Sequence, residues 1–296
     1  MLKILLIGTQ GQLGWELVRT LAPLGQVVGL DFPQIDLCDY KNVRNLIGEV
    51  KPDLIVNAAA YTNVDKAESE PEKARTINAL AVAEMANAAS KLGIGLIHYS
   101  TDYVFDGAKG SPYVETDNPN PLNVYGATKL EGDEAVINNA KMFWIFRTSW
   151  VYSDRVGGFV NKVLEWAHTQ EVMRVVSDQV SGPTWCRMLA EATSLAIVMG
   201  RKDLPEWMQS TTGLYHLAGG GYASRYEWAK AIIENDPQRQ TQTVKDILPA
   251  KSADFPTPTR RPLFSALDCT LFADTFGIKL PDWGKALRLA FKNDPD

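Results

Sequence analysis

Met1-Leu-Lys-Ile-Leu-Leu-Ile-Gly8-Thr-Gln-Gly11-Gln-Leu-Gly14 opens the chain and joins a short apolar run to three evenly spaced glycines. The apolar run predicts a buried strand over residues 2–7, and a helix is expected directly after the glycines. Because glycine has no side chain, the main chain of such a loop can approach a pyrophosphate held at the helix N-terminus. A glycine triplet alone is more often an ordinary turn. Its place directly after the first strand favours a dinucleotide-binding loop.

The first half of the chain alternates short apolar runs with longer amphipathic stretches. This alternation is typical of a parallel sheet whose strands are connected by crossover helices. It predicts an α/β fold with a Rossmann-type doubly wound parallel sheet. The expected strands span residues 2–7, 27–30, 54–56, 94–99 and 143–146, and the expected helices span residues 12–24, 43–50, 71–92 and 125–140.

The regular pattern weakens after Trp150, where loops and mixed elements follow. We expect this part of the chain to contribute a smaller α/β substrate-binding domain. Two domains are compatible with the length of the chain. The dinucleotide-binding domain is predicted to comprise residues 1–150 with about 187–218 and 260–270, and the substrate domain about 151–186, 219–259 and 271–296.

The composition argues against several classes of partner. The 296 residues are 45% hydrophobic and carry a formal net charge of −5, with acidic and basic side chains interspersed. A nucleic-acid partner would need a clustered basic face, so we expect none. The apolar N-terminal run is too short for a membrane span, so we expect neither a membrane anchor nor a targeting segment. The three cysteines lack the spacing of a zinc or redox motif, and a cytoplasmic protein with a small-molecule partner is expected.

Asp31 ends the second predicted strand, where a carboxylate can accept hydrogen bonds from both hydroxyls of a nucleotide ribose. The alternative is an aspartate that caps a helix or a loop. A 2′-phosphate would place like charges side by side with this carboxylate, and the glycine loop and Phe32 supply no cation to offset them. NADH is therefore expected to serve at least as well as NADPH.

Tyr125-Gly-Ala-Thr-Lys129 places a phenol and an ammonium on one face of a predicted helix, because residues four apart are neighbours. The cation is expected to favour the phenolate and so make the phenol a better proton donor to a carbonyl group. Tyr226 and Lys230 have the same spacing on another predicted helix. Tyr125 is preferred because it follows Thr101 at a strand end, where ligands of parallel sheets bind. Tyr226 is interpreted as a packing residue.

With these residues assembled, the sequence resembles the extended short-chain dehydrogenase/reductase family over its whole length. Several longer stretches are similar to one branch of that family, the dTDP-4-dehydrorhamnose reductases. These stretches are Asn57-Ala-Ala-Ala-Tyr-Thr-Asn-Val-Asp65, Ser100-Thr-Asp-Tyr-Val-Phe-Asp-Gly107, Tyr125 to Glu131, Arg147-Thr-Ser-Trp-Val-Tyr152, Asp178-Gln-Val-Ser-Gly-Pro-Thr184 and Arg261-Pro-Leu-Phe-Ser-Ala-Leu-Asp268.

The resemblance implies that NADH or NADPH delivers a hydride to C4 of a dTDP-4-keto sugar. Tyr125 would protonate the oxygen, Thr101 would hydrogen-bond it, and Lys129 would hold the nicotinamide ribose. Arg261, with Arg260 as a second candidate, would meet the substrate diphosphate through its planar donor group. The implied cofactor contacts are Gly8, Gln10, Gly11, Gln12, Leu13, Gly14, Asp31, Leu37, Asp39, Ala58, Ala59, Ala60, Tyr125 and Lys129, and the sugar pocket would be lined by Val64, Asp102, Tyr103 and Trp150.

Some of these residues could have purely structural roles, and other functions are compatible with parts of the pattern. Tyr103 and Trp150 could be core aromatics, and surface arginines usually bind nothing so specific. Nucleotide-sugar dehydratases share the Tyr/Lys pair, but they carry an Asp-Glu pair after the threonine, and Asp102 is followed here by Tyr103. Epimerizing reductases usually add a Cys/His pair, which none of the quoted motifs contains. A non-catalytic regulatory subunit, as in methionine adenosyltransferase, would not need an intact Thr101, Tyr125 and Lys129.

A divalent ion is bound at a dimer interface in some members of the family, through acidic side chains that follow the Pro-Thr motif. This sequence departs from that pattern, because Arg187 stands near the place of one such carboxylate, with Glu191 one turn further on. Mg²⁺ is therefore not expected to be required, and no metal ligand is predicted. A dTDP-sugar is the expected partner, and the resemblance allows a homodimer.

Overall fold

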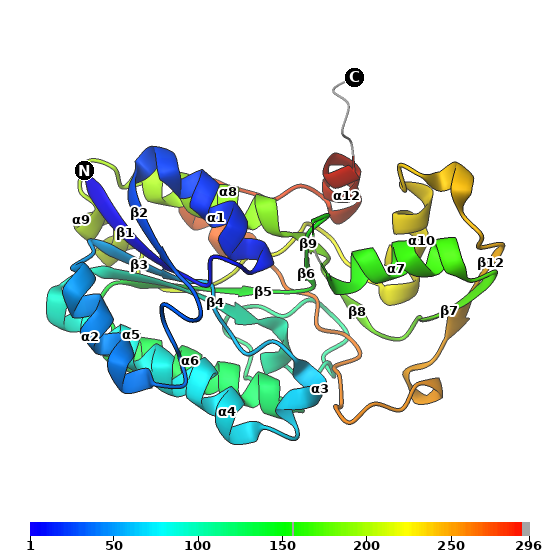
Figure 1. Cartoon of the computed structure of the whole chain (residues 1–296), viewed down its shortest axis with the longest axis horizontal. Helices are drawn as coiled ribbons and strands as arrows, with labels where there is room; N and C mark the ends of the chain where they lie inside the picture. The colour runs from blue at the N-terminus through cyan, green and yellow to red at the C-terminus, as the bar shows by residue number, and fades with distance from the viewer. Residues whose placement is uncertain (156, 292–296) are drawn as a thin grey trace.

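A six-stranded parallel sheet forms the centre of the computed structural model, which describes residues 1–155 and 157–291 (Figure 1). Its strand order is β10-β5-β4-β3-β1-β2. All neighbouring strands run parallel. The predicted Rossmann-type doubly wound sheet is thereby confirmed. The strands are β1 (Leu2–Ile7), β2 (Gly25–Leu30), β3 (Leu54–Asn57), β4 (Gly95–Thr101), β5 (Phe143–Thr148) and β10 (Gly213–His216).

Helices cover both faces of the sheet because side chains alternate along each strand. In β1, Leu5 belongs to the core beneath one set of helices, whereas Ile4 belongs to the core beneath the other. Figure 1 shows α1 and α8 on the upper face and α2, α5 and α6 on the lower face. Their bounds are α1 (Gln12–Leu21), α8 (Cys186–Met199), α2 (Tyr40–Val50), α5 (Ala81–Leu92) and α6 (Val124–Asn139).

Three predicted helices differ from the observed ones in ways that local chemistry explains. The first ends at Leu21, and a short 3₁₀ turn carries Pro23, which has no N–H to donate to a continuing helix. The second begins three residues early, since the Asp39 side chain caps it by accepting from the N–H of Asn42. The third is interrupted by a π turn, so that α4 (Pro71–Arg75), the turn η2 (Thr76–Leu80) and α5 follow one another.

A smaller α/β lobe lies beside the sheet and is seen on the right of Figure 1. It is built from two short strand pairs and two helices, with the β6–β9 pair next to it. Its elements are α7 (Gly158–Thr169), β7 (Val172–Val176), β8 (Val180–Ser181), β11 (Ala223–Ser224), α10 (Arg225–Glu234) and β12 (Asp246–Ala250), and the adjoining strands are β6 (Val151–Tyr152) and β9 (Thr184–Trp185). Among the described residues, no helix combines the length and apolar character needed to cross a bilayer.

Helix α11 (Thr270–Phe276) falls largely in the stretch assigned from sequence to the substrate domain, but it packs against the central sheet. The ring of Phe272 lies 5.5 Å from that of Phe146 in β5, and the ring of Phe276 lies 5.1 Å from that of Trp144. We therefore propose that α11 belongs to the dinucleotide-binding domain. The other domain boundaries are kept as proposed.

A buried ion pair fastens α6 to the sheet. The Oδ2 atom of Asp133 lies 3.0 Å from Nε of Arg147 in β5, and both side chains are almost completely buried. A second ion pair of the same helix, between Glu131 and Arg75, is partly exposed. Exposed pairs contribute little because water screens them, whereas breaking a buried pair leaves a charge without a partner.

Replacing Asp133 with asparagine is expected to lower the free energy of unfolding by about 3–5 kcal/mol, because the buried Arg147 cation loses its counter-ion. The matched change Glu131→Gln on the same helix should cost less than about 1 kcal/mol. Urea unfolding followed by circular dichroism measures both. Equal losses in the two variants would show that burial does not set the strength of this pair.

Candidate active site

The glycine loop packs so closely that two of its glycines cannot be replaced. Gly8 has a φ of +92°, and a Cβ on it would lie 2.7 Å from the main-chain nitrogen of Ala59. A Cβ on Gly14 would overlap the carbonyl group of Gly8. The loop therefore connects β1 directly to α1 and packs against the segment that follows β3. The cradle leaves main-chain groups and the helix N-terminus available to a phosphate.

Gln12 and Asp31 border this loop. The Oε1 atom of Gln12 is buried and has no hydrogen-bond partner among the described residues, so an acceptor remains for a bound ligand. Asp31 accepts a hydrogen bond from the N–H of Gln10 at 2.7 Å and one from the N–H of Phe32 at 2.8 Å. Within the chain, Asp31 therefore acts as a loop cap, which was the alternative interpretation. Its contact with a ribose stays a prediction. The cradle and the unpaired acceptor fit a dinucleotide.

Other predicted cofactor contacts have structural roles within the chain. Leu37 is part of the apolar core under α2, and Asp39 caps that helix. Ala58 donates its N–H to the carbonyl group of Ile7 at 2.9 Å, which places the segment after β3 beside the glycine loop. Their contacts with a nucleotide remain predictions.

Thr101 and Tyr125 meet at the carboxyl edge of the sheet. Thr101 is the last residue of β4, and Tyr125 lies in the first turn of α6, which Asn123 caps by accepting from the N–H of Gly126 at 2.8 Å. A Cβ on Gly126 would overlap the carbonyl group of Tyr103, so this glycine lets the helix rest against the chain after β4. Thr101 lies close enough to Tyr125 to act on its phenol, and burial raises the pKa of that phenol.

Lys129 points toward the sheet. Its ammonium nitrogen Nζ donates to the carbonyl group of Tyr99 at 2.7 Å and lies 3.1 Å from Nε2 of His98. Burial lowers the pKa of Lys129 to about 8. Burial of the phenol dominates and raises the pKa of Tyr125, and the expected influence of the Lys129 cation on that phenol stays a prediction. Lysine stems are long, so a spacing of four residues does not decide where the nitrogen lies.

Asp102 was predicted to line the sugar pocket, but its carboxylate is occupied by protein hydroxyls. Oδ1 accepts from Thr101 Oγ1 at 3.2 Å, and Oδ2 accepts from Ser181 Oγ at 3.0 Å and from Ser265 Oγ at 2.5 Å. Burial raises the pKa of Asp102 to about 6, and these hydrogen bonds oppose the rise. The residue joins β4 to β8 and to the chain around Ser265 and holds the Thr101 hydroxyl, and its place in the sugar pocket stays a prediction. Sequence reasoning missed both serines, although each lies inside a quoted motif.

Tyr103, Trp150, Arg225 and Arg261 lie where the two lobes meet. The ring of Tyr103 meets that of Tyr125 edge to face at 5.7 Å. The guanidinium of Arg225 stacks on Trp150 at 3.7 Å, and its charge acts on the nearby phenol of Tyr103. Burial lowers the pKa of Arg225 to about 10, with Arg261 as a nearby like charge. Arg225 was missed because it lies in no recognised motif.

Arg261 and Val64 are also brought to this junction. Arg261 Nη2 donates to Asp65 Oδ2 at 2.8 Å, and Thr259 donates to the carbonyl group of Val64 at 3.1 Å. Trp150 stacks on Trp228 at 5.5 Å, so aromatic packing explains its buried face. The substrate roles of Val64, Trp150 and Arg261 stay predictions.

The look-alike pair of Tyr226 and Lys230 lies in the smaller lobe. The phenol of Tyr226 donates to the carbonyl group of Ile247 at 3.4 Å, and the Lys230 ammonium lies 5.6 Å from the centre of its ring. The ring packs against the main apolar core. These contacts are those of a packing residue.

Arg187 and Glu191, the two residues singled out after the Pro-Thr motif, are paired with each other. Arg187 Nε lies 3.0 Å from Oε1 of Glu191, so the carboxylate is already paired with a cation. Over residues 1–155 and 157–291, no three His, Cys, Asp or Glu side chains gather in a way that could hold a metal ion.

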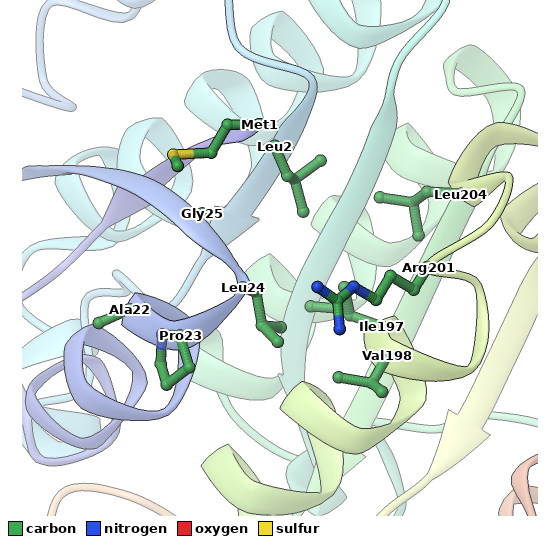
Figure 2. A pocket seen from close by; sticks show the side chains of 10 residues that line it. All are labelled: Met1, Leu2, Ala22, Pro23, Leu24, Gly25, Ile197, Val198, Arg201 and Leu204. Atoms are coloured by element: carbon green, nitrogen blue, oxygen red, sulfur yellow. The ribbon is translucent and has the colours of Figure 1, made fainter.

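The hollow shown in Figure 2 lies away from this site. Its lining includes Leu2, Gly25 and Arg201, and it sits at the amino-terminal ends of β1 and β2. Ligands of doubly wound sheets bind at the carboxyl ends of the strands, where Thr101 ends β4. The hollow is therefore not assigned to the cofactor or the substrate.

Asp102 should make stability depend on pH in an unusual direction. Because its pKa is raised from 3.8 to about 6 in the folded protein, its protonated form is favoured by folding. The contribution is present below 3.8 and is lost as the pH rises through about 6, a span worth at most about 3 kcal/mol. Asp102→Asn removes this term. The difference in unfolding free energy, native chain minus variant, should therefore decrease as the pH rises from 3.8 to about 6. A difference that does not change with pH would contradict the raised pKa of Asp102.

Comparison with known proteins agrees with this geometry. The family model described as the RmlD substrate binding domain matches residues 2–294. A dTDP-4-dehydrorhamnose reductase from Burkholderia thailandensis is 41% identical, over 99% of this chain and 99% of the relative. Among solved structures, such a reductase from Clostridium acetobutylicum has a TM-score of 0.88 at 32% identity, covering 97% of this chain and 98% of the other.

The reductase from Bacillus anthracis, solved in complex with NADP, has a TM-score of 0.86 at 31% identity and covers 99% of both chains. The resemblance inferred from the motifs is confirmed at nearly full length. The chain belongs to the family of the RmlD substrate binding domain, whose similar members are named dTDP-4-dehydrorhamnose reductases.

Proposed function

We propose that the chain reduces the C4 keto group of dTDP-4-dehydro-L-rhamnose to give dTDP-L-rhamnose, with NADH or NADPH as the reductant. The observation that carries the proposal is the position of Thr101 and Tyr125 at the carboxyl edge of the sheet, where β3 alone separates β4 from β1 and its glycine loop. The names of the full-length relatives support the choice of substrate.

The chain's own groups are arranged to handle the proton of this reaction. A bound reduced nicotinamide would supply the hydride. Tyr125 keeps its proton at neutral pH because burial raises its pKa, so the phenol is available to protonate the carbonyl oxygen. Thr101 donates its hydroxyl proton to Asp102 Oδ1 in the structure, and it would hydrogen-bond the same carbonyl oxygen once that hydroxyl turns toward it. Lys129 lies one turn further along α6, and to hold the nicotinamide ribose its nitrogen would have to turn away from the carbonyl group of Tyr99, to which it donates in the structure.

The substrate is proposed to lie between the lobes. Arg225 and Arg261 place two guanidinium groups beside Tyr103, and such groups match the geometry of a diphosphate. Val64 and Trp150 are proposed to border the sugar. Cofactor contacts are also proposed for the glycine loop, for Asp31, for two residues just before α2 and for three residues after β3. These are Gly8, Gln10, Gly11, Gln12, Leu13, Gly14, Asp31, Leu37, Asp39, Ala58, Ala59 and Ala60.

Elimination and epimerization are less well supported. Position 103 carries a tyrosine next to two arginines, so no carboxylate follows Asp102 to act as the second acid or base. Burial raises the pKa values of Cys186 and Cys269 to about 12, which makes both thiols poor bases. A simple keto reduction needs neither group.

Tyr125→Phe is expected to fold normally and to lose turnover by about 10² to 10⁴-fold, because only the proton donor is removed. Tyr226→Phe is the matched control and should keep essentially all turnover. Steady-state oxidation of the cofactor with the dTDP-4-keto sugar measures both. Near-normal turnover of the Tyr125 variant would sink the assignment, and a comparable loss at Tyr226 would show that the wrong helix was chosen.

NADH is expected to serve at least as well as NADPH, because a 2′-phosphate would lie near the Asp31 carboxylate. The specificity constants of both cofactors should be compared at one ionic strength. A preference for NADPH of tenfold or more, about 1.4 kcal/mol, would mean that Asp31 does not contact the ribose.

A chelator is expected to change activity little, because Glu191 is paired with Arg187 and is not left for a cation. Turnover with and without excess EDTA checks this. Complete loss of activity that added magnesium restores would refute the proposal that no metal is required.

A further inference from the structure

A line of buried polar side chains runs beneath Lys129. Asn57 ends β3 and lies opposite His98 of β4 in the parallel register. Both are fully buried, and Lys129 is 1% exposed. Nδ2 of Asn57 lies 3.1 Å from Nδ1 of His98, and Nε2 of the same ring lies 3.1 Å from Nζ of Lys129. None of these contacts was used in the assignment of the reaction.

The direction of each hydrogen bond follows from the first member of the line. The N–H of Ala59 donates to Oδ1 of Asn57 at 3.1 Å, so the amide oxygen faces Ala59 and the NH₂ group faces His98. The NH₂ group can only donate, and Nδ1 of His98 must therefore accept. Burial lowers the pKa of His98 well below its usual range, so the ring is neutral. Its single proton consequently sits on Nε2.

This tautomer restricts the protonation state of Lys129. Nε2–H points at Nζ, and an ammonium group offers only donors. A neutral amine has a lone pair that can accept from Nε2–H while its own N–H donates to the carbonyl group of Tyr99 at 2.7 Å. Every polar atom of the line is then satisfied, whereas an ammonium would leave two donors facing each other in a buried place.

We infer that His98, held as the Nε2–H tautomer by Asn57, is a positioning residue that donates to Lys129 and disfavours its ammonium form. The inference rests on the proposed function in that Lys129 is taken to serve the reduction. It also joins the segment around Ala59, proposed to contact the cofactor, to Lys129 through consecutive hydrogen bonds.

The other titratable side chains near Lys129 do not disfavour its ammonium form. Asp133 lies one turn further along α6 and raises the pKa of Lys129, but its carboxylate is paired with Arg147. Tyr125 lies one turn earlier and stays protonated because burial raises its pKa. Burial still lowers the pKa of Lys129 to about 8, in the same direction as the donor from His98.

The tautomer can be measured without turnover. The chain has three histidines, and ¹⁵N spectra of histidine-labelled protein distinguish protonated from unprotonated ring nitrogens. His168→Gln and His216→Gln assign two rings and leave His98 by difference, even if a His98 variant does not fold. At neutral pH we expect Nε2 of His98 to be protonated and Nδ1 unprotonated. The opposite tautomer, or a doubly protonated ring, would overturn the inference.

The effect on Lys129 is measured by the pH dependence of kcat/KM for the reduced cofactor, which reports ionisations of the free enzyme. In His98→Gln the amide oxygen can accept from an ammonium, so the alkaline limb should move to higher pH by about one unit, a tenfold change in the ionisation constant.

His216→Gln is the matched control, because His216 is equally buried in a strand of the same sheet but contacts Tyr113 instead. Its alkaline limb should stay in place. An unchanged limb in His98→Gln, or the same shift in both variants, would overturn the inference. Failure of the native enzyme to reduce the sugar would contradict the proposed function alone, because the tautomer is measured independently.

Discussion

Burial of Lys129 under α6 is the constraint on which the arrangement of the site depends. Its nitrogen bonds to the main chain of β4, and Gly126 in the same helix rests against the carbonyl group of Tyr103. With the helix held this close, Tyr125 lies beside Thr101 at the strand end. The low-dielectric surroundings then raise the pKa of the phenol and lower that of the amine. The close packing of α6 on the sheet therefore determines both where Tyr125 and Lys129 lie and how their pKa values shift.

A second buried group, the carboxylate of Asp102, ties the end of β4 to the smaller lobe. Asp102 accepts hydrogen bonds from Thr101, Ser181 and Ser265, which come from three separate parts of the chain. The threonine that would meet the carbonyl oxygen is thus held by the same carboxylate that connects the lobes. Arg225 and Arg261 lie next to this junction, so a diphosphate bound there would be recognised by both lobes at once.

Much of the fold followed from sequence because periodicity is local. The strand predicted over residues 2–7 has the observed bounds, and α6 begins one residue before its predicted start. The identities of Thr101, Tyr125 and Lys129 were also read from short motifs. The protonation states of these residues could not be read from the motifs, because their pKa values depend on burial. The position of the Lys129 nitrogen could not be read either, because it depends on the sheet beneath the helix. Arg225 and Ser181 come from distant segments, and no local pattern reports which strand end they meet.

The most direct test of the account is the fate of the hydride. The enzyme would be given NADH deuterated at the transferable C4 position and a dTDP-4-keto-6-deoxy sugar, and the product would be examined by mass spectrometry and NMR. The account predicts one deuterium, bound to C4 of the sugar, in dTDP-L-rhamnose. A product without deuterium, deuterium at another carbon, or a product formed by loss of water would contradict it.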